Sequence, residues 1–451
     1  MNPALRALNH FGLGARVGEA RRLDDPRAWL RAQLRPGSAL LEGGGLPTLD
    51  EAGEAMRRVR EAQTAADRPS VQAARRALQQ IRQREGIAAL TRRVATEAPF
   101  LERLVAFWSD HLCVSVAAKQ PVIPLAGLYE REVIRPHVLG LFADMVLASA
   151  RHPAMLYYLD NFQSIGPESA GARAQARRRG RERGLNENYA RELLELHTLG
   201  VDGGYTQQDV IALAKILTGW TVQRQVRGGP GGEGYAFRPA LHEPGPKTLL
   251  GRTYDQGGAK EGEAAIRDLC AHPATARFLA RKLAGHFVAD DPPESAVERL
   301  AGVYRESGGD LRVVSETLVD LDETWDPANR KLRTPQDWVV GVLRAVGARE
   351  VGPPVVQVLQ ALRHPLWAPA APRGYGDLVR EWADPDSLMN RAELARTMAR
   401  RVGRGALDPA RLEEVVDLPP DDPLRGFLAD ESIATDERVA LAFGGPAFQW
   451  R

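Results

Sequence analysis

Residues 184–220 read GLNENYARELLELHTLGVDGGYTQQDVIALAKILTGW, and this stretch decides the fold class. A dense set of polar residues opens one helix, and a glycine-rich turn leads into the next. In the second helix the apolar residues recur at intervals of three and four, which is the spacing of an amphipathic helix, at Val210, Leu213, Ala214 and Leu217. The stretch therefore predicts two helices joined by a turn.

The same periodicity extends over most of the chain. It predicts a helix that starts at Pro26 behind the capping residue Asp25, and further helices near 72–95, 137–149, 261–270, 274–288, 294–306, 310–321, 334–346 and 385–402. Alternating Val, Ile and Thr are scarce, with one exception over residues 235–254, where extended stretches flank an EPGPK turn. We therefore predict a mainly α protein with one small inserted β-hairpin. The expected organisation is a single domain, with N-terminal helices (1–98), a motif-bearing core (99–224), the hairpin insertion (225–257) and C-terminal helices (258–451).

Composition sets broad limits on function. The 451 residues include 44% hydrophobic and 26% charged residues, and the net charge is +2. These values are ordinary for a soluble protein, and the balanced charge makes nucleic-acid binding an unfavoured function. No apolar run approaches the roughly 20 residues that span a bilayer. The start shows no export signal, so a cytoplasmic location is the default expectation, with export if a leader is missing. Cys113 and Cys270 lie in unrelated contexts, and both are expected to be small core residues.

The helix over 187–199 carries the first candidate site. On a helical wheel, His197 falls in the middle of an apolar arc, which favours a packing role over a chemical one. Asn188, Glu192 and Glu195 form a separate stripe with Arg191 beside it. Glu192 is flanked by leucines, so we expect its carboxylate to be at least partly buried.

Three other stretches carry candidate residues. Arg135 and His137 lead into an apolar helix, in which His137 and Asp144 share one stripe. Arg135, or an arginine elsewhere in the chain, is the simplest cation for a buried Asp144. In the WSDH stretch, His111 falls on the apolar face of its helix, with Lys119 shortly after it. Asp160 and Asn161 stand at a helix end before an arginine-rich loop over 166–184, and such acceptors serve either as a helix terminus or as site residues.

The remaining motifs are less specific. The turn over 242–247 places His242, Glu243 and Lys247 together, and this composition is compatible with a structural turn or with groups that close over a cleft. Thr206 and Asp209 form a helix-capping arrangement. The signatures HExxH, GxSxG and GxxxxGK[ST] do not occur, and no Rossmann glycine pattern follows a predicted strand. A divalent metal is compatible with the chain but not required by it, and its candidate ligands would be His111, His137, Asp160, Glu187 and Glu192.

The combination WSDHLCVS, YEREVIRPHVLG, ARHPAMLYYLDNFQSIG, NENYARELLELHTLGVDGGYTQQDV, LTGW, HEPGPKTLLG and FVADDPP resembles the bacterial domain-of-unknown-function family 1800 over nearly the whole chain. The resemblance implies a helical fold but no defined activity. It also implies a partner related to sulfatases and alkaline phosphatases, at the cell envelope. The family pattern falls on His111, Lys119, Glu130, Arg135, His137, Asp160, Asn161, Asn186, Glu187, Asn188, Arg191, Glu192, Asp209, Trp220, His242 and Lys247.

Two functions of different classes follow. In the first, a helical enzyme, hydrolytic or metal-assisted, gathers its catalytic residues around a cleft, namely His111, His137, Asp160, Glu187, Asn188 and Glu192. Its substrate would be held by Lys119, Arg135, Arg191, His242 and Lys247. In the second, the polar motifs tie buried helix ends together, and the protein is a scaffold or chaperone for the partner. Convergence on one water-accessible pocket favours the enzyme. Separate, internally satisfied networks and an exposed apolar patch favour the scaffold.

Overall fold

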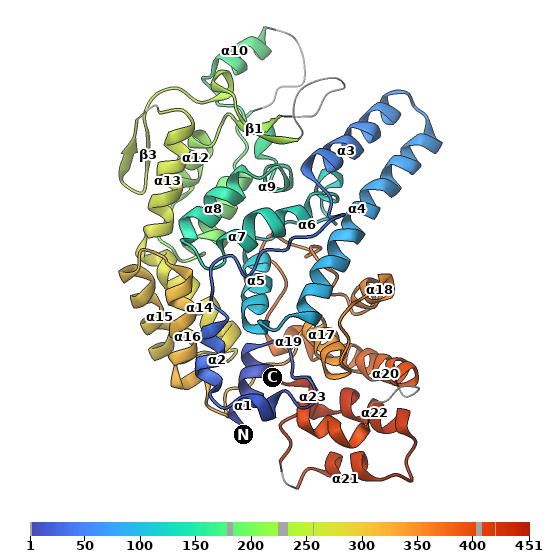
Figure 1. Cartoon of the computed structure of the whole chain (residues 1–451). Coiled ribbons are helices and arrows are strands. Elements are labelled where there is room, and N and C mark those ends of the chain that lie inside the picture. The colour runs from blue at the N-terminus through green and yellow to red at the C-terminus, as the bar shows by residue number, and fades with distance from the viewer. Residues whose placement is uncertain (1, 178–183, 224–232, 256, 403–407, 420) are drawn as a thin grey trace.

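The computed structural model of the protein describes residues 2–177, 184–223, 233–255, 257–402, 408–419 and 421–451 (Figure 1). Helices form most of this part of the chain, which confirms the predicted mainly α class. The N-terminal helices are α1 (Pro3–Arg6), α2 (Pro26–Ala32), α3 (Leu49–Thr64) and α4 (Arg68–Ala95). The helices of the central part are α5 (Pro99–His111), α6 (Ala126–Tyr129), α7 (Arg135–His137), α8 (Phe142–Arg151), α9 (Pro153–Tyr158), α10 (Ala170–Ala176), α11 (Asn188–Glu192) and α12 (Gln207–Ile216).

Four short strands follow and then the C-terminal helices. The strands are β1 (Trp220–Gln223), β2 (Gly234–Phe237), β3 (Lys247–Leu249) and β4 (Arg252–Tyr254). The first helices after them are α13 (Ala259–Ala271), α14 (Pro273–Phe287), α15 (Glu294–Glu306), α16 (Leu311–Asp320), α17 (Pro335–Ala345) and α18 (Pro353–Ala361). The chain ends with α19 (Val379–Trp382), α20 (Pro385–Val402), α21 (Pro423–Ala429), α22 (Thr435–Gly444) and α23 (Pro446–Gln449).

Helix α5 lies near the middle of the molecule, between the long α3–α4 hairpin and the group of α13 to α16 (Figure 1). The two ends of the chain come together beneath it. There, the Arg451 guanidinium donates a hydrogen bond of 3.0 Å to the carbonyl oxygen of His10, and Leu332 pairs with Trp450 in an antiparallel bridge. The division of the chain into four regions stays a prediction.

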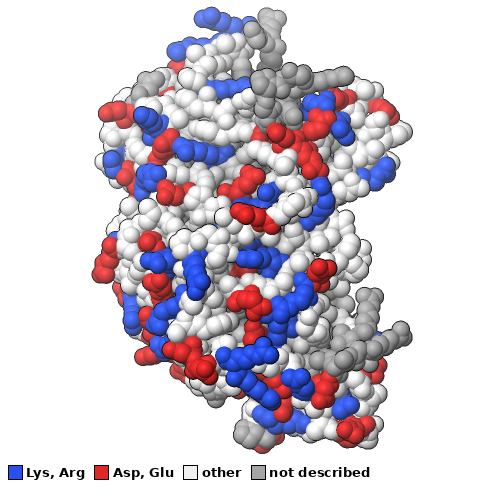
Figure 2. Space-filling view, viewed as in Figure 1, with Lys and Arg blue, Asp and Glu red and all other residues white. Residues whose placement is uncertain are grey.

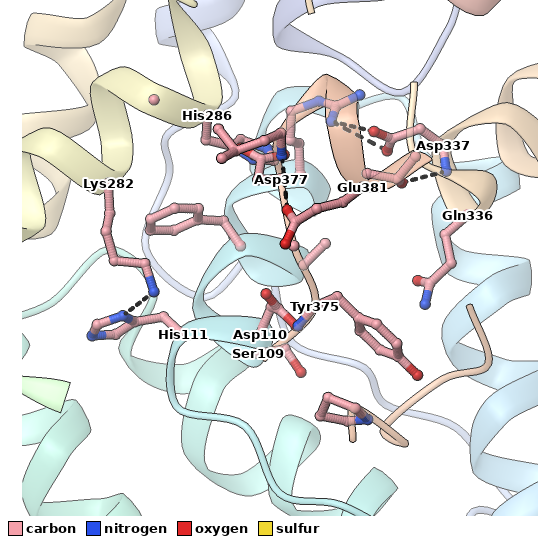
Figure 3. Close-up of a pocket in the computed structure, with 18 of the residues that line it drawn as sticks. Ser109, Asp110, His111, Lys282, His286, Gln336, Asp337, Tyr375, Asp377 and Glu381 are labelled. Atoms are coloured by element: carbon pink, nitrogen blue, oxygen red, sulfur yellow. Dashed lines mark hydrogen bonds and ion pairs between the residues drawn. The ribbon is translucent and has the colours of Figure 1, made fainter. Parts of the chain in front are cut away.

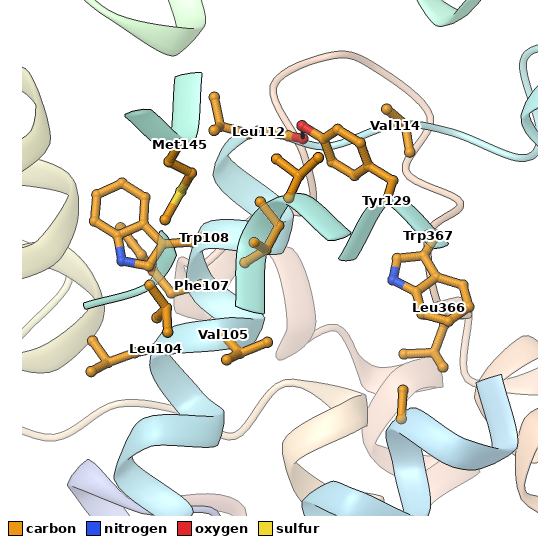
Figure 4. Packing of buried hydrophobic residues seen from close by; sticks show 14 of the residues in the cluster. Leu104, Val105, Phe107, Trp108, Leu112, Val114, Tyr129, Met145, Leu366 and Trp367 are labelled. Carbon is orange, nitrogen blue, oxygen red and sulfur yellow. Dashed lines mark hydrogen bonds between the residues drawn. The ribbon is translucent and has the colours of Figure 1, made fainter. Parts of the chain in front are cut away.

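The core around α5 explains why this helix is central (Figure 4). Pro99 starts the helix, and Leu104, Trp108 and Leu112 are all at most 1% exposed. The hydroxyl of Tyr129 donates a hydrogen bond of 2.8 Å to the carbonyl oxygen of Leu112, so the polar end of this buried ring is satisfied. Burial of large apolar side chains stabilises the folded state by roughly 1.5–3 kcal/mol for each side chain. The packing fixes the position of the last turn of α5, which also carries Asp110 and His111.

The strands differ from the predicted hairpin in their pairing and in the position of the tight turn. Strand β2 pairs with β1, in the register Trp220 to Phe237, and β3 pairs with β4 in a second two-stranded sheet. The tight turn lies at Leu250 and Gly251, not at EPGPK, because both residues adopt positive φ angles, +49° and +76°, as a two-residue hairpin turn requires.

The predicted helix over 137–149 is interrupted. Helix α7 ends at His137, and α8 begins at Phe142. Between them Leu141 forms an isolated bridge with Asp310, and the Phe142 N–H donates to the Gly309 carbonyl oxygen. The expectation that His137 and Asp144 share one continuous stripe is therefore wrong, because a tertiary contact breaks the helix between them.

Other local predictions are confirmed. Asp25 caps α2, and Thr206 and Asp209 form a capping box at α12. Cys113 and Cys270 are buried free thiols.

The loop predicted over 166–184 contains α10, and residues 178–183 lie outside the described part of the chain. In the described residues no helix has the length and apolar character needed to cross a bilayer. On the face shown in Figure 2, acidic and basic side chains are interspersed, in keeping with the small net charge.

Candidate active site

A cavity of about 460 Å³ lies beside the end of α5, and we call it the α5–α14 cavity (Figure 3). Four parts of the chain form most of its lining: the C-terminal half of α5, α14 with residues 290–292, the start of α17, and the segment 364–381. Leu13 and Arg93 complete the lining. Its volume falls in the range of small-molecule sites, about 300–1,000 Å³. Because these parts are far apart in the sequence, only the folded chain forms the cavity.

Asp110 presents a carboxyl group to the cavity from the last turn of α5. The backbone N–H of Tyr375 donates a hydrogen bond of 2.8 Å to Asp110 Oδ1. Gly374 makes this contact feasible, because its φ is +82° and a Cβ atom there would lie 2.6 Å from the Asp110 carbonyl oxygen. Burial raises the pKa of Asp110 to about 7. The carboxyl group can therefore both accept and release a proton near neutral pH.

Lys282 faces the same cavity from α14, together with His111. Lys282 Nζ lies 3.1 Å from His111 Nδ1, and His111 Nε2 lies 3.1 Å from the carbonyl oxygen of His197. A carbonyl can only accept a hydrogen bond, so Nε2 carries the proton of His111 and Nδ1 accepts from the lysine. Burial lowers the pKa of His111 and also lowers the pKa of Lys282. The imidazole is thus a neutral support that orients the lysine amine.

Two pairs of side chains, each containing a carboxylate, hold the far wall of the cavity. The Arg103 guanidinium donates to both carboxylate oxygens of Asp337, at 3.1 and 3.2 Å, and His286 Nδ1 lies 3.0 Å from Asp377 Oδ2. Burial alone would raise the pKa of Asp337 and of Asp377, but Arg103 holds the first pKa well below its usual range and His286 does the same for the second. Burial lowers the pKa of His286 to about 4, against the opposing effect of Asp377. Arg103 thus neutralises the first carboxylate, and the Lys331 ammonium, whose Nζ lies 3.5 Å from Asp377 Oδ2, neutralises the second.

Asp110 and Lys282 differ from the other charged residues that line the cavity. Apart from the exposed Asp291 and Arg380 at the rim, they alone of the described charged residues in the lining have no ion-pair partner. Each is close enough to shift the pKa of the other, since Lys282 acts to lower the pKa of Asp110 and Asp110 acts to raise that of Lys282. Burial of a charge without a partner lowers the stability of the folded protein. Two such charges in one cavity therefore indicate a ligand-binding role.

Of the predicted site residues, His111 lines this cavity and the others lie elsewhere in the molecule. Arg135 is buried in an ion network behind the cavity, where it donates to Glu102 at 2.9 Å and to Glu130 at 3.0 Å. Glu130 also accepts hydrogen bonds from Ser109 at 3.2 Å and from the Trp367 indole at 3.0 Å. Burial alone would lower the pKa of Arg135, but the two carboxylates raise it. Asp144, whose expected cation was Arg135 or another arginine, pairs with Arg267 at 3.1 Å.

A second group of predicted residues gathers around the end of α9 and the start of α11. Lys119 pairs with Asp160 at 2.5 Å, and the Asn188 amide donates to the neighbouring Leu159 carbonyl oxygen at 3.4 Å. On α11, Arg191 pairs with Glu187 at 3.3 Å. These contacts bring part of the predicted set together, although no described contact joins the group to His111 or His137.

Glu192, also on α11, is half-buried, as the sequence predicts. Burial raises the pKa of Glu192, and Glu195 raises it further. His197, at the end of the following π-helical turn, is 1% exposed, which confirms the prediction that it packs in the core.

The remaining predicted residues make local contacts. His137 Nδ1 lies 2.7 Å from the Val133 carbonyl oxygen, one turn earlier in the chain. His242 and Lys247 are buried beside Glu261, with Lys247 Nζ and His242 Nε2 each 3.1 Å from Glu261 Oε2. This cluster joins the strand region to α13. The catalytic and substrate-binding roles assigned to all these residues from the sequence stay predictions.

The expected metal ligands are not grouped. Within the described residues, no set of three or more His, Cys, Asp or Glu side chains has a geometry that could hold a metal ion. His111 contacts Lys282 and the His197 carbonyl oxygen, whereas Asp160 pairs with Lys119.

Sequence reasoning missed Asp110, Lys282 and the 364–381 segment with Tyr375 as parts of the site. Two signals were present. Asp110 directly precedes His111 in the WSDH motif, and Lys282 is one of only six lysines in a chain with 60 basic residues. Neither signal gives a position in space.

The chain is similar to a known protein family over nearly its full length. The family model described as "Protein of unknown function (DUF1800)" matches residues 6–450. No curated protein and no solved structure matches the chain. Since the family model covers nearly the full length, the chain belongs to the DUF1800 family, whose function is uncharacterised.

Proposed function

We propose that the protein is an enzyme that hydrolyses a small molecule in the α5–α14 cavity, with Asp110 as general acid and base and Lys282 as the cation that stabilises negative charge on oxygen. One observation carries the proposal: both groups face the same cavity and lack ion-pair partners among the described residues, while the charges on the far wall are neutralised. A carboxylate base and a nearby cation are the two groups that addition of water to a carbonyl carbon needs.

The steps follow from these two groups. The Asp110 carboxylate takes a proton from a water molecule as the water oxygen bonds to the carbonyl carbon of the substrate. The negative charge then moves to the carbonyl oxygen, where the Lys282 ammonium stabilises it. When the bond to the leaving group breaks, protonated Asp110 returns the proton to that group. His111 keeps the lysine in position throughout, because its Nδ1 atom accepts a hydrogen bond from Nζ.

The test compares matched variants on a mixture of small molecules. Wild-type protein, Asp110→Asn and Lys282→Met are incubated with a metabolite extract in H₂¹⁸O, and mass spectrometry follows which compounds are consumed and which products gain ¹⁸O. Asp386→Asn and Lys260→Met change the same residue types at exposed positions on α20 and α13. The proposal expects ¹⁸O-labelled products with the wild type and both controls, reduced at least 100-fold in the two cavity variants. A wild-type protein that changes no compound, or an Asp110→Asn variant of equal activity, would overturn it.

Other observations favour a second function, that of a scaffold. The buried charges of Arg135 and Lys247 are paired with nearby carboxylates. Large apolar side chains are exposed on three packed helices, at Met389 on α20, Phe427 on α21 and Leu441 on α22. A sulfatase-related partner, which the family resemblance suggests, would bind there. Substituting these three residues by serine would then abolish co-purification with the partner and leave hydrolysis unchanged.

A further inference from the structure

A second, smaller pocket of about 190 Å³ lies between helices α4 and α18, and we call it the α4–α18 groove. Each helix contributes residues at intervals of three and four, so a single face of each helix borders the groove. The residues of α4 are Gln79, Arg82, Gln83 and Gly86, and those of α18 are Pro353, Val356, Gln357 and Gln360. Pro365, Leu366 and Trp367 form its remaining wall.

Arg82 is the unusual residue of this groove. Its side chain is half-buried, and it makes no hydrogen bond or ion pair with any residue that the structure describes. Burial lowers the pKa of Arg82, and no acidic neighbour acts in the opposite direction. By contrast, Arg84, two positions along the same helix, pairs with Glu51 on α3. A partly desolvated guanidinium without an acid is unfavourable unless an anion binds to it.

The other side chains of the groove fit a small polar ligand. The four glutamine amides are exposed and have no hydrogen-bond partner among the described residues, so each can donate to or accept from a ligand. Among the described residues that line the groove, none is acidic. Gly86 lies against the wall, because a Cβ atom there would be in ordinary contact with Leu366, at 3.5 Å.

The wall at Trp367 is firmly held. Its indole N–H donates to Glu130 at 3.0 Å, and its carbonyl oxygen accepts from the Val116 N–H at 2.8 Å. The groove therefore has a fixed apolar wall, a cation and surrounding amides, and this arrangement exists in the folded protein before any ligand arrives.

We infer that the α4–α18 groove is a binding site for a small oxyanion, a carboxylate or a phosphate, which the Arg82 guanidinium binds and the glutamine amides orient. The site is distinct from the α5–α14 cavity, since its lining includes neither Asp110 nor Lys282. The two pockets do share Leu366 and Trp367, which lie between them. The inference is independent of the proposed hydrolysis.

Isothermal titration calorimetry with inorganic phosphate and with succinate, at constant ionic strength in chloride, tests the site on the full chain. We expect saturable binding of at least one anion by the wild type, and the preferred anion distinguishes a phosphate site from a carboxylate site. Arg82→Gln should weaken binding at least tenfold. Arg84→Gln, which removes the same charge from the same helix, should change the affinity less than twofold.

Two further variants locate the bound anion. Val356→Trp, which fills the groove and leaves every charge in place, should weaken binding like Arg82→Gln. Asp110→Asn should bind the anion as the wild type does. Circular dichroism and the unfolding midpoint confirm that each variant is folded. The inference is overturned if the wild type binds neither anion saturably, if Arg82→Gln and Arg84→Gln have equal effects, or if Asp110→Asn abolishes binding.

Discussion

The Nζ atom of Lys282 lies 3.1 Å from the Nδ1 atom of His111, and this contact holds a lysine amine at the wall of the α5–α14 cavity without an acidic partner. The neutral imidazole orients the amine but does not neutralise it. The lysine thus keeps its charge available for a ligand, and the protein bears the cost of partly burying that charge.

The Lys282→Met variant should reveal how much stability the protein loses by partly burying this charge. The variant is expected to lose ligand binding in the cavity while its free energy of unfolding at pH 7 stays equal or rises by up to about 1 kcal/mol, because methionine needs no hydration. Burial lowers the pKa of Lys282 in the folded protein, so wild-type stability should rise as pH increases through that lowered value towards 10. The advantage of the variant should therefore shrink between pH 7 and pH 10 in urea denaturation. A variant that is several kcal/mol less stable would show that the lysine is structural.

The contribution of Asp110 to stability should change with pH in the opposite direction. Its folded pKa is raised to about 7, so the folded state holds a proton that the unfolded chain has released, and this contribution to stability is lost as pH rises from about 4 to 7. Asp110→Asn keeps an oxygen for the Tyr375 N–H and avoids the charge. We expect it to be more stable than the wild type at pH 8 by roughly 1–3 kcal/mol and nearly equal at pH 4.5. A constant difference between the two pH values would contradict the raised pKa.

Gly374→Ala tests the close approach that positions Asp110. The positive φ disfavours alanine, and the added Cβ would clash with the Asp110 carbonyl oxygen. The loss of stability should exceed about 1 kcal/mol. Gly245→Ala is a suitable control, since that residue has a similar φ of +79° with no heavy atom within 4 Å of the added Cβ. If both variants lose the same stability, the φ angle accounts for the whole effect and the contact is unimportant.

Arg135→Met should be among the most destabilising substitutions in the molecule. It leaves Glu102 and Glu130 buried without this cation, and breaking such a pair from one side costs about 3–5 kcal/mol. The exposed pair of Arg191 and Glu187 provides the comparison, because Arg191→Met should cost no more than about 1 kcal/mol. Chemical denaturation of both variants measures the difference. Similar losses would mean that the network behind the cavity is not needed for stability.

Glu192→Gln separates the α11 cluster from the cavity. The carboxyl group is half-buried beside Glu195, and both the burial and the charge of Glu195 raise its pKa. The neutral amide should therefore leave the free energy of unfolding unchanged or increase it by up to about 1 kcal/mol. If the α5–α14 cavity is the active site, hydrolysis should be unaffected. A loss of hydrolysis in a folded variant would return the active site to α11, where the sequence first placed it.

Part of the candidate site could be predicted from the sequence. The WSDH motif pointed to His111, and the apolar spacing of α5 placed its imidazole towards the interior, where it is 2% exposed. Lys282 could not be found in this way, because 171 residues separate it from His111 and no periodicity links the two helices. The family motif at Arg135 was equally visible, but whether a buried arginine binds a substrate or two carboxylates depends on what lies opposite it.

The helical class, the caps at Asp25 and Thr206, and the burial of His197 could all be predicted from the sequence, because each depends on side chains within a few turns of one helix. The separation of α7 and α8 at Leu141, and the meeting of Asp110, Lys282 and the 364–381 segment at one cavity, depend instead on contacts between distant elements. Helix propensity and amphipathic spacing are local properties. A cavity is formed where packed elements leave space, so its lining depends on contacts between segments that the chain order does not specify.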